Sequence, residues 1–220
     1  MATFVLIHGA GDSSWYWHLA AAALRERGHD IVAPDLPCED DSAGLSEYTD
    51  TVLDAIGGRA DLVVVAQSSG AFTAPLVCTR TPVELLVLLA GLIPAQGEAA
   101  QDWWTNTGYQ PVRGDWPDDD ASIFYHDVAP DLVVEALKRA RRQSDTPAEE
   151  PWPLERWPDV RTGFLLCRQD RLLPASFLRR VVRERLGITP DEIDGGHCVA
   201  LSRPEELAAR LDAYRAEQLR

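Results

Sequence analysis

Short runs of Val, Ile and Leu alternate along the chain with longer segments of helical periodicity. The apolar runs carry no alternating polar positions, which is typical of strands that a parallel sheet buries on both faces. The runs that fit this pattern best are residues 3–7, 30–33, 62–66, 85–90 and 163–167. Strands separated by helices predict an α/β fold with a mostly parallel central sheet and helices on both of its faces.

Helical periodicity is clearest over residues 14–27, where Trp15, Leu19 and Leu24 share one face and Gly28 follows as a C-terminal cap. A second helix is expected directly after Ser68. Three more are expected over residues 132–142, 176–186 and 204–215.

Residues 95–158 interrupt the alternation of strands and helices. This stretch contains seven prolines and five of the seven tryptophans. We expect a small helical lid inserted into a single domain of residues 1–220, because a Trp-rich segment between two strands of an α/β sheet fits a cover over a cleft. The run Asp118 to Asp120 within it is expected to be a solvated loop, with a metal site as the alternative.

Net charge and cysteine content limit the classes of binding partner and the cellular location that we expect. The net charge is −14 and the isoelectric point is about 4.7, so the field repels nucleic acid and anionic membranes and leaves a small molecule as the expected partner. The four cysteines form no CxxC pair, which favours a reducing, cytoplasmic setting. The first nine residues have no basic region before their apolar run, so no secretory signal is expected. A monomer or a homodimer is expected.

The segment around Ser68 has the pattern of a nucleophile elbow, in which a buried strand turns sharply into a helix. The turn forces the central residue into a strained backbone conformation and leaves room only for small residues two positions to either side. Ala66 and Gly70 meet this requirement around Ser68. With Ser69 as the nucleophile, Gln67 would occupy the first crowded position; a further alternative is an ordinary helix N-cap at either serine.

A serine nucleophile needs a base and an acid that orients it. His197 follows two glycines on a loop near the C-terminus and is the expected base, with His8 as an alternative. Asp170 follows the predicted strand at 163–167 and is the expected acid. Asp191 and Asp194 are alternatives, although both are close in sequence to His197.

An oxyanion hole has candidates in the small-residue loop Gly9 to Gly11, whose backbone N–H groups would act together with the N–H of Ser69. The chain order Ser68, Asp170, His197 is the order typical of α/β-hydrolases. The base, nucleophile and donors are all supplied by the protein, so neither a cofactor nor a metal is expected.

With these residues in place, the sequence resembles the α/β-hydrolase superfamily over nearly its whole length, and most closely its compact branch of esterases, methylesterases and hydroxynitrile lyases. The shared segments are residues 5–10, 15–17, 28–36, 124–127 and 195–197, together with the elbow. The resemblance implies an oxyanion hole formed by the backbone N–H groups of Ala10 and Ser69. It also implies a lid that shapes the substrate pocket.

Two departures from the family pattern lie beside the predicted triad. Ala66 and Gln67 stand where the family usually has glycine and histidine, so the polarity beside the nucleophile differs. Cys198 stands where the related lyases carry a lysine, which disfavours cyanogenic lyase activity. We expect Cys198 to act as a small apolar neighbour, with a reactive thiol as the alternative.

The leading hypothesis is a serine hydrolase that cleaves a carboxylic ester of a small to medium apolar or aromatic molecule through an acyl-enzyme. Six aromatic residues are the expected pocket lining, namely Trp15, Trp103, Trp104, Tyr109, Phe124 and Tyr125. One alternative is a tailoring enzyme that uses the same triad for acyl transfer, lactonisation or proton transfer in a dry pocket. Another is a ligand receptor on the hydrolase scaffold.

Overall fold

The computed structural model describes residues 1–112 and 114–218 and shows a six-stranded sheet in which every pairing is parallel. The strand order is β2-β1-β3-β4-β5-β6. The strands are β1 (Thr3–Ile7), β2 (Asp30–Val32), β3 (Leu62–Gln67), β4 (Leu85–Leu89), β5 (Thr162–Cys167) and β6 (Asp191–Ile193). The predicted parallel α/β fold is therefore confirmed, with one strand more than expected.

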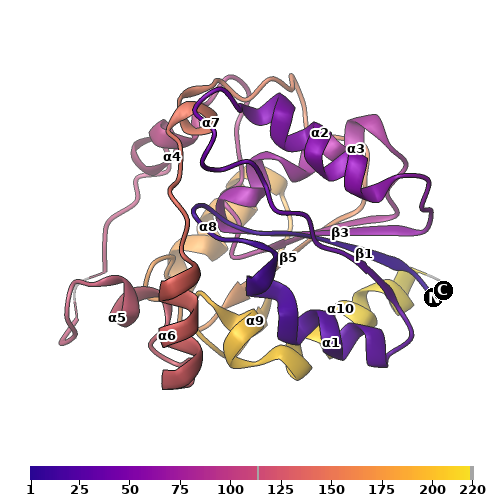
Figure 1. Ribbon diagram of the computed structural model, residues 1–220. Coiled ribbons are helices and arrows are strands. Elements are labelled where there is room, and N and C mark those ends of the chain that lie inside the picture. Colours follow the sequence, from indigo (N-terminus) through magenta and orange to yellow (C-terminus); the bar gives the residue numbers. More distant parts are fainter. Residues whose placement is uncertain (113, 219–220) are drawn as a thin grey trace.

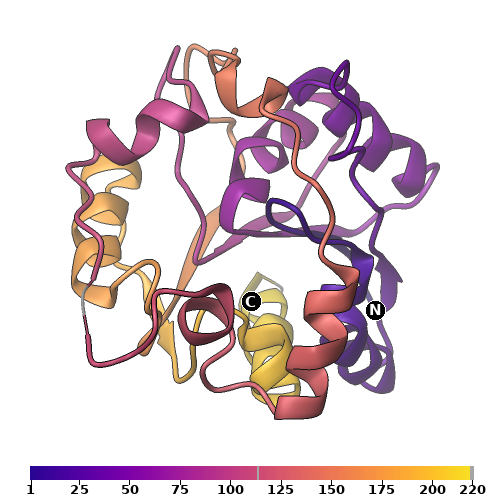
Figure 2. The ribbon, with the colours of Figure 1, turned by 60° about the vertical axis from the view of Figure 1, so that its left-hand side comes forward.

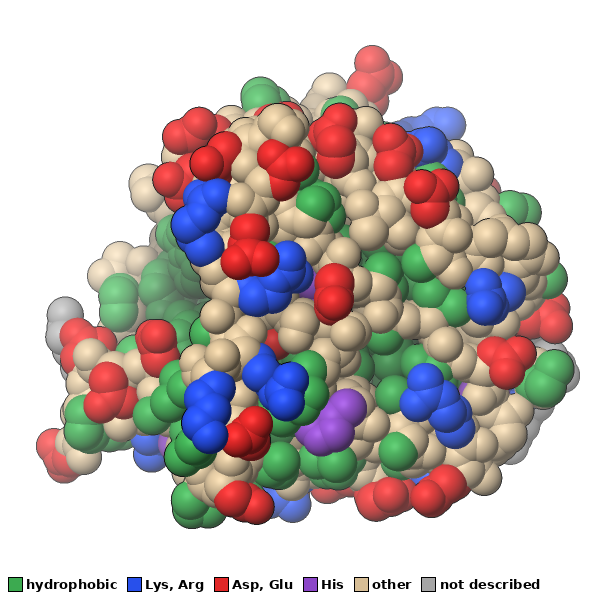
Figure 3. Space-filling model, in the orientation of Figure 1, with side chains coloured by type: hydrophobic (Ala, Val, Ile, Leu, Met, Phe, Trp, Pro, Cys, Tyr) green, Lys and Arg blue, Asp and Glu red, His purple; other side chains and the backbone are tan. Residues whose placement is uncertain are grey.

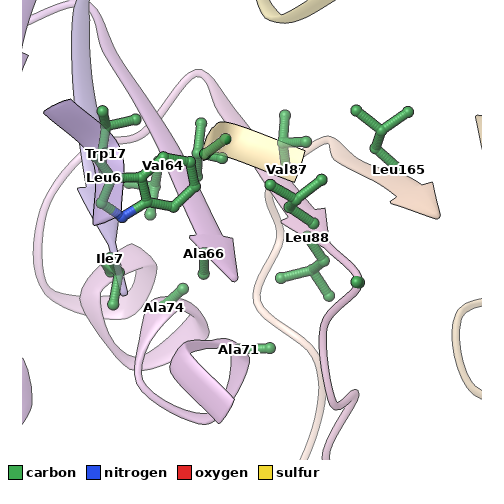
Figure 4. Packing of buried hydrophobic residues seen from close by; sticks show 14 of the residues in the cluster. Leu6, Ile7, Trp17, Val64, Ala66, Ala71, Ala74, Val87, Leu88 and Leu165 are labelled. Carbon is green, nitrogen blue, oxygen red and sulfur yellow. The ribbon is translucent and has the colours of Figure 1, made fainter. Parts of the chain in front are cut away.

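The central strands are buried and apolar except for Thr3 at the start of β1 and Gln67 at the end of β3. Every residue of β1, β3 and β4 is buried, and their side chains form the middle of the core. Figure 4 shows Leu6 and Ile7 of β1 beside Val64 of β3 and Val87 of β4. Burial of this kind contributes roughly 1.5 to 3 kcal/mol to the free energy of folding for each large aliphatic side chain. These three strands therefore supply a large part of the stability of the fold.

Helices cover both faces of the sheet (Figure 1). On one face lie α1 (His18–Glu26) and α10 (Pro204–Gln218), and on the other lie α2 (Leu45–Ile56) and α3 (Ala74–Arg80). A 3-10 turn, η1 (Ser14–Trp17), precedes α1, and a second, η2 (Ser68–Phe72), joins β3 to α3. The remaining helices of the body are α8 (Ala175–Leu186) and α9 (Val199–Ser202). Gly28 has a φ of 83°, as its position after α1 requires.

The segment between β4 and β5, here the β4–β5 segment (residues 90–161), holds α4 (Ala100–Asn106), α5 (Asp120–Phe124), α6 (Pro130–Arg139) and α7 (Thr146–Glu149). It crosses the molecule at the end of the sheet where the strands finish (Figures 1 and 2). The two ends of the segment pair with each other, since Trp152 N–H donates to Glu98 and Gly97 N–H donates to Trp152. Residues near the start of the segment therefore lie beside residues near its end, and the stretch between them is bonded to the body as well, since the N–H groups of Arg141 and Ser144 donate to Gly11 and Cys38.

Charged side chains of both signs are interspersed on the face seen in Figure 3, with acidic groups in the majority. The four cysteines are all free thiols. Within residues 1–112 and 114–218, no helix has both the length and the apolar character that a membrane span requires.

Candidate active site

The residues that carry the predicted chemistry follow the carboxyl ends of the strands. Ser68 comes directly after β3 and has a φ of 51°, a left-handed conformation that is strained for any residue other than glycine. A Cβ atom at Gly70 would lie 2.7 Å from the carbonyl oxygen of His8, and Ala66 is fully buried. Small residues at both flanks are thus required by the close approach of the turn to β1, as the elbow pattern predicts.

Asp170 and His197 form a buried pair. Asp170 lies three residues beyond β5, and its Oδ1 accepts hydrogen bonds from the backbone N–H groups of Leu172 and Leu173, each at 2.9 Å. Its Oδ2 lies 2.8 Å from Nδ1 of His197. The His197 and Asp170 side chains are 3% and 0% exposed. Because the backbone fixes one carboxylate oxygen, the other is aimed at the imidazole and holds its proton on Nδ1.

The opposite ring nitrogen of His197 faces Gln67. The distance from Gln67 Nε2 to His197 Nε2 is 2.9 Å, and both side chains are buried. With the ring proton on Nδ1, Nε2 is an acceptor, so the amide of Gln67 donates to it. Among the described residues, no hydrogen bond joins Ser68 Oγ to His197.

Both ring nitrogens of His8 are engaged in hydrogen bonds to the backbone of nearby loops. Nδ1 donates to the carbonyl oxygen of Gly9 at 2.7 Å, and Nε2 accepts the backbone N–H of Leu36 at 3.0 Å. Burial lowers the pKa of His8 and keeps the ring neutral. These bonds fix the loop after β1 and leave His8 no free nitrogen with which to act as a base.

The expected nucleophile, base and oxyanion donors line one cavity of about 390 Å³. Ser68 and His197 lie in its wall together with Ala10 and Ser69. Of the six predicted pocket aromatics, the structure brings three to this cavity: Trp104, Phe124 and Tyr125. The rings of Phe124 and His197 meet edge to face with centroids 5.6 Å apart.

The other three predicted pocket residues lie elsewhere. Trp103 is fully buried in the core, where its indole N–H donates to the carbonyl oxygen of Ile93 at 2.8 Å. Tyr109 lines a separate hollow, and its hydroxyl donates to Leu172 at 2.7 Å. Trp15 stacks on His18, with ring centroids 4.6 Å apart. These three rings pack the β4–β5 segment and η1 onto the body, and they do not line the cavity that holds Ser68.

A second, smaller cavity of about 70 Å³ lies behind the oxyanion loop. Ala10 and Ser69 belong to the walls of both cavities. The remaining walls of the small cavity are mainly apolar and include Leu36, Leu45 and Phe72. The two backbone N–H groups predicted for the oxyanion hole therefore lie between a large and a small compartment.

The alternatives left open by the sequence occupy other positions. Asp194 pairs with Arg168 at 2.9 Å, and Asp191 accepts the hydroxyl of Tyr214 at 2.7 Å. Burial raises the pKa of the Cys198 thiol well above its usual value, and nearby carboxylates including Asp12 raise it further, so the thiol stays protonated and unreactive. Asp119 caps α5 by accepting the N–H of Ser122 at 2.7 Å. Within the described ranges, no group of three or more His, Cys, Asp or Glu side chains is arranged to hold a metal.

Four features of the site were not predicted. The Gln67–His197 bond joins residues 130 positions apart, and Asp12 lines the large cavity. In addition, Asp127 Oδ2 accepts the N–H of Gly196 at 2.7 Å, and His126 Nε2 donates to the carbonyl oxygen of Gln169 at 2.9 Å. The turn that follows α5 is thus bonded to the loops that carry His197 and Asp170. The shared segment 124–127 was the one sequence signal for this contact.

Comparison with known proteins supports the fold. The Alpha/beta hydrolase family matches residues 4–210. Norfluorocurarine synthase 2 from a Strychnos species is 25% identical over 93% of this chain and 91% of its own. Methyl jasmonate esterase 1 from Vitis vinifera is 23% identical over 94% of each chain. The crystal structure of polyneuridine aldehyde esterase superposes with a TM-score of 0.81 at 18% identity, covering 97% of this chain and 99% of that one.

Proposed function

The chain belongs to the alpha/beta hydrolase family, and on this premise we propose that it is a serine hydrolase that cleaves carboxylic esters through an acyl-enzyme. The observation that carries the proposal is the shared cavity, in which Ser68 of the strained elbow and the Asp170-paired His197 line one wall. Relatives named as esterases support the same reaction class.

In the proposed reaction Ser68 Oγ attacks the ester carbonyl and passes its proton to His197 Nε2. Asp170 keeps the other proton on Nδ1 and stabilises the imidazolium that forms. The backbone N–H groups of Ala10 and Ser69 bind the oxyanion. His197 then returns the proton to the departing alcohol, and a water molecule, activated by the same base, releases the acid and regenerates Ser68.

The two cavities divide the substrate. The leaving alcohol must reach His197, which lines only the large cavity, so the alcohol part belongs there. The acyl chain then extends into the small apolar cavity past Ala10 and Ser69. Because that cavity measures about 70 Å³ against about 390 Å³, we propose a substrate with a short acyl chain and a larger, partly aromatic alcohol.

The β4–β5 segment acts in this proposal as the lid that supplies Trp104, Phe124 and Tyr125 to the alcohol compartment. The four free thiols favour a cytoplasmic setting for the enzyme. A single chain holds every residue of the proposed site, so a monomer suffices and a homodimer is compatible.

Labelling with a fluorophosphonate tests the nucleophile, with intact mass and peptide mapping as the readout. We expect one adduct on Ser68 in the native protein and in Ser69→Ala, which keeps its backbone N–H, and none in Ser68→Ala. Phenyl acetate should be hydrolysed by the first two proteins and not by the third. An adduct on Ser69, or equal turnover by Ser68→Ala, would overturn the assignment.

Relatives named as synthases make the fate of the acyl group a separate question. Hydrolysis in ¹⁸O-labelled water should place ¹⁸O in the carboxyl group of the released acid. Transfer to an added alcohol, with no labelled acid formed, would favour the tailoring enzyme over the esterase. Covalent labelling without turnover of any ester would favour the receptor.

A further inference from the structure

Asp12 places a carboxylate in the wall of the large cavity, two residues after Ala10. Its Oδ1 accepts the backbone N–H of Ser13 at 2.8 Å. Within residues 1–112 and 114–218, no protein group donates a hydrogen bond to its Oδ2. One oxygen of a partly buried carboxylate is therefore available to a ligand in the cavity.

Among the residues that the structure describes, none provides a cation that pairs with Asp12. Burial and, to a lesser extent, the neighbouring carboxylate of Asp35 raise its pKa to about 6, although the hydrogen bond from Ser13 lowers it. Arg141 lines the same cavity, but its guanidinium is bonded to Glu39 and to the carbonyl oxygen of Leu36. Tyr125 and Cys198, which also lie near Asp12, stay neutral because burial raises the pKa of each.

A negative charge at this position opposes the proposed reaction unless something neutralises it. The oxyanion develops at the N–H of Ala10, in the same cavity, and like charges in an enclosed site repel strongly. A cation on the substrate would remove this penalty by pairing with Asp12. Trp104, Phe124 and Tyr125 line the same cavity, and aromatic rings attract cations.

We propose that Asp12 selects substrates in which the alcohol part of the ester carries a protonated amine, held by the free carboxylate oxygen and enclosed by the aromatic wall. This inference rests on the proposed function, because it assigns the alcohol to the cavity that contains His197. It gives a substrate class to a chain whose acidic surface already attracts cations over longer distances.

The test compares two esters of equal shape. In 3-(dimethylaminomethyl)phenyl acetate the amine is protonated, and in 3-isobutylphenyl acetate a CH group replaces the NH⁺. We expect the native enzyme to favour the ammonium ester by about 10- to 100-fold in kcat/KM, the range of a charge-assisted hydrogen bond. Asp12→Asn keeps the acceptor for Ser13 and should bring the ratio close to one. This variant should cleave the neutral 3-isobutylphenyl acetate at least as fast as the native enzyme does, because the negative charge that opposes the oxyanion is gone.

Asp120→Asn is the matched control, since Asp120 is exposed and lines the same cavity. It should keep the preference. A preference that survives in Asp12→Asn, or that Asp120→Asn removes, would overturn the assignment to Asp12. Cleavage of both esters at one rate by the native enzyme would also overturn it, while leaving the esterase proposal standing.

A binding measurement separates this inference from the esterase proposal. Calorimetric titration of Ser68→Ala with N,N-dimethylbenzylammonium requires no turnover. We expect binding that weakens about 10- to 100-fold on further introduction of Asp12→Asn. If Ser68→Ala binds the ammonium compound in this way but the native protein hydrolyses no ester, the amine site is supported and the esterase proposal is overturned. No Asp12-dependent binding would overturn the amine site.

Discussion

The side-chain amide of Gln67 lies 2.9 Å from Nε2 of His197, the nitrogen that accepts the proton of Ser68 in the proposed mechanism. The amide N–H and the Ser68 hydroxyl are therefore alternative donors to one lone pair. In the structure the amide of Gln67 donates to this lone pair. Attack by Ser68 requires this bond to break, so residue 67 sets part of the barrier to acylation.

Gln67→Ala should accelerate acylation, because it removes the competing donor and leaves the His197–Asp170 pair in place. A buried hydrogen bond contributes about 1 kcal/mol net, which corresponds to a roughly fivefold gain. The measurement is the second-order rate constant for fluorophosphonate labelling of Ser68. A slower rate with unchanged thermal stability would show instead that Gln67 positions the imidazole.

Asp170→Asn should remove activity without loosening the loop. An asparagine oxygen can still accept the N–H groups of Leu172 and Leu173, but its NH₂ group would face His197 and move the ring proton to Nε2. The base would then have no lone pair for Ser68, and kcat should fall by about 10⁴. Chemical unfolding checks that stability is kept. A loss of less than tenfold would contradict the assignment of Asp170 as the orienting acid.

Ser68→Gly should be inactive and more stable than Ser68→Ala. Both variants lose the hydroxyl, but only glycine relieves the φ of 51°. The expected difference in the free energy of unfolding is about 1 kcal/mol, measured by urea denaturation of the two variants. Equal stability, or a more stable alanine variant, would mean that the elbow carries no strain.

Asp12→Asn should stabilise the protein increasingly as the pH rises. The unfolded carboxyl loses its proton near pH 4, whereas the folded one keeps it to about pH 6 because burial and Asp35 raise its pKa. The native protein with Asp12 therefore loses stability as the pH rises from about 4 to about 6. The Asp12→Asn variant has no carboxyl group at this position and does not lose it. We expect a gain of about 1 to 3 kcal/mol at pH 8 and little at pH 4. A gain independent of pH would contradict a partly buried Asp12 whose pKa is raised in the folded state.

The sequence was most informative where one physical requirement dominates a local segment. Uniform apolar runs identified five strands, and the small residues beside Ser68 identified the elbow. The strand Asp191–Ile193 was missed because it is three residues long and two of them are acidic. The helix Leu45–Ile56 was also not predicted, although its apolar residues follow a helical period.

Side-chain direction was the main quantity that local patterns could not supply. Trp103 and Trp104 are adjacent, yet one is in the core and the other is in the cavity wall. Asp12 has no sequence feature that distinguishes it from a solvated loop acid. Its importance comes from the distant segments that close around it, which only the tertiary structure brings together.

The bonds from Asp127 to Gly196 and from His126 to Gln169 make the turn after α5 a shared support for two loops. One of those loops carries His197, the proposed base, and the other carries Asp170, the proposed acid. A movement that lifted α5 away to admit substrate would disturb both at once, so the enzyme would be switched off while it stood open at this end. Substrate that enters without disturbing the two loops must pass another part of the β4–β5 segment. The position of the segment therefore couples substrate entry to the reaction.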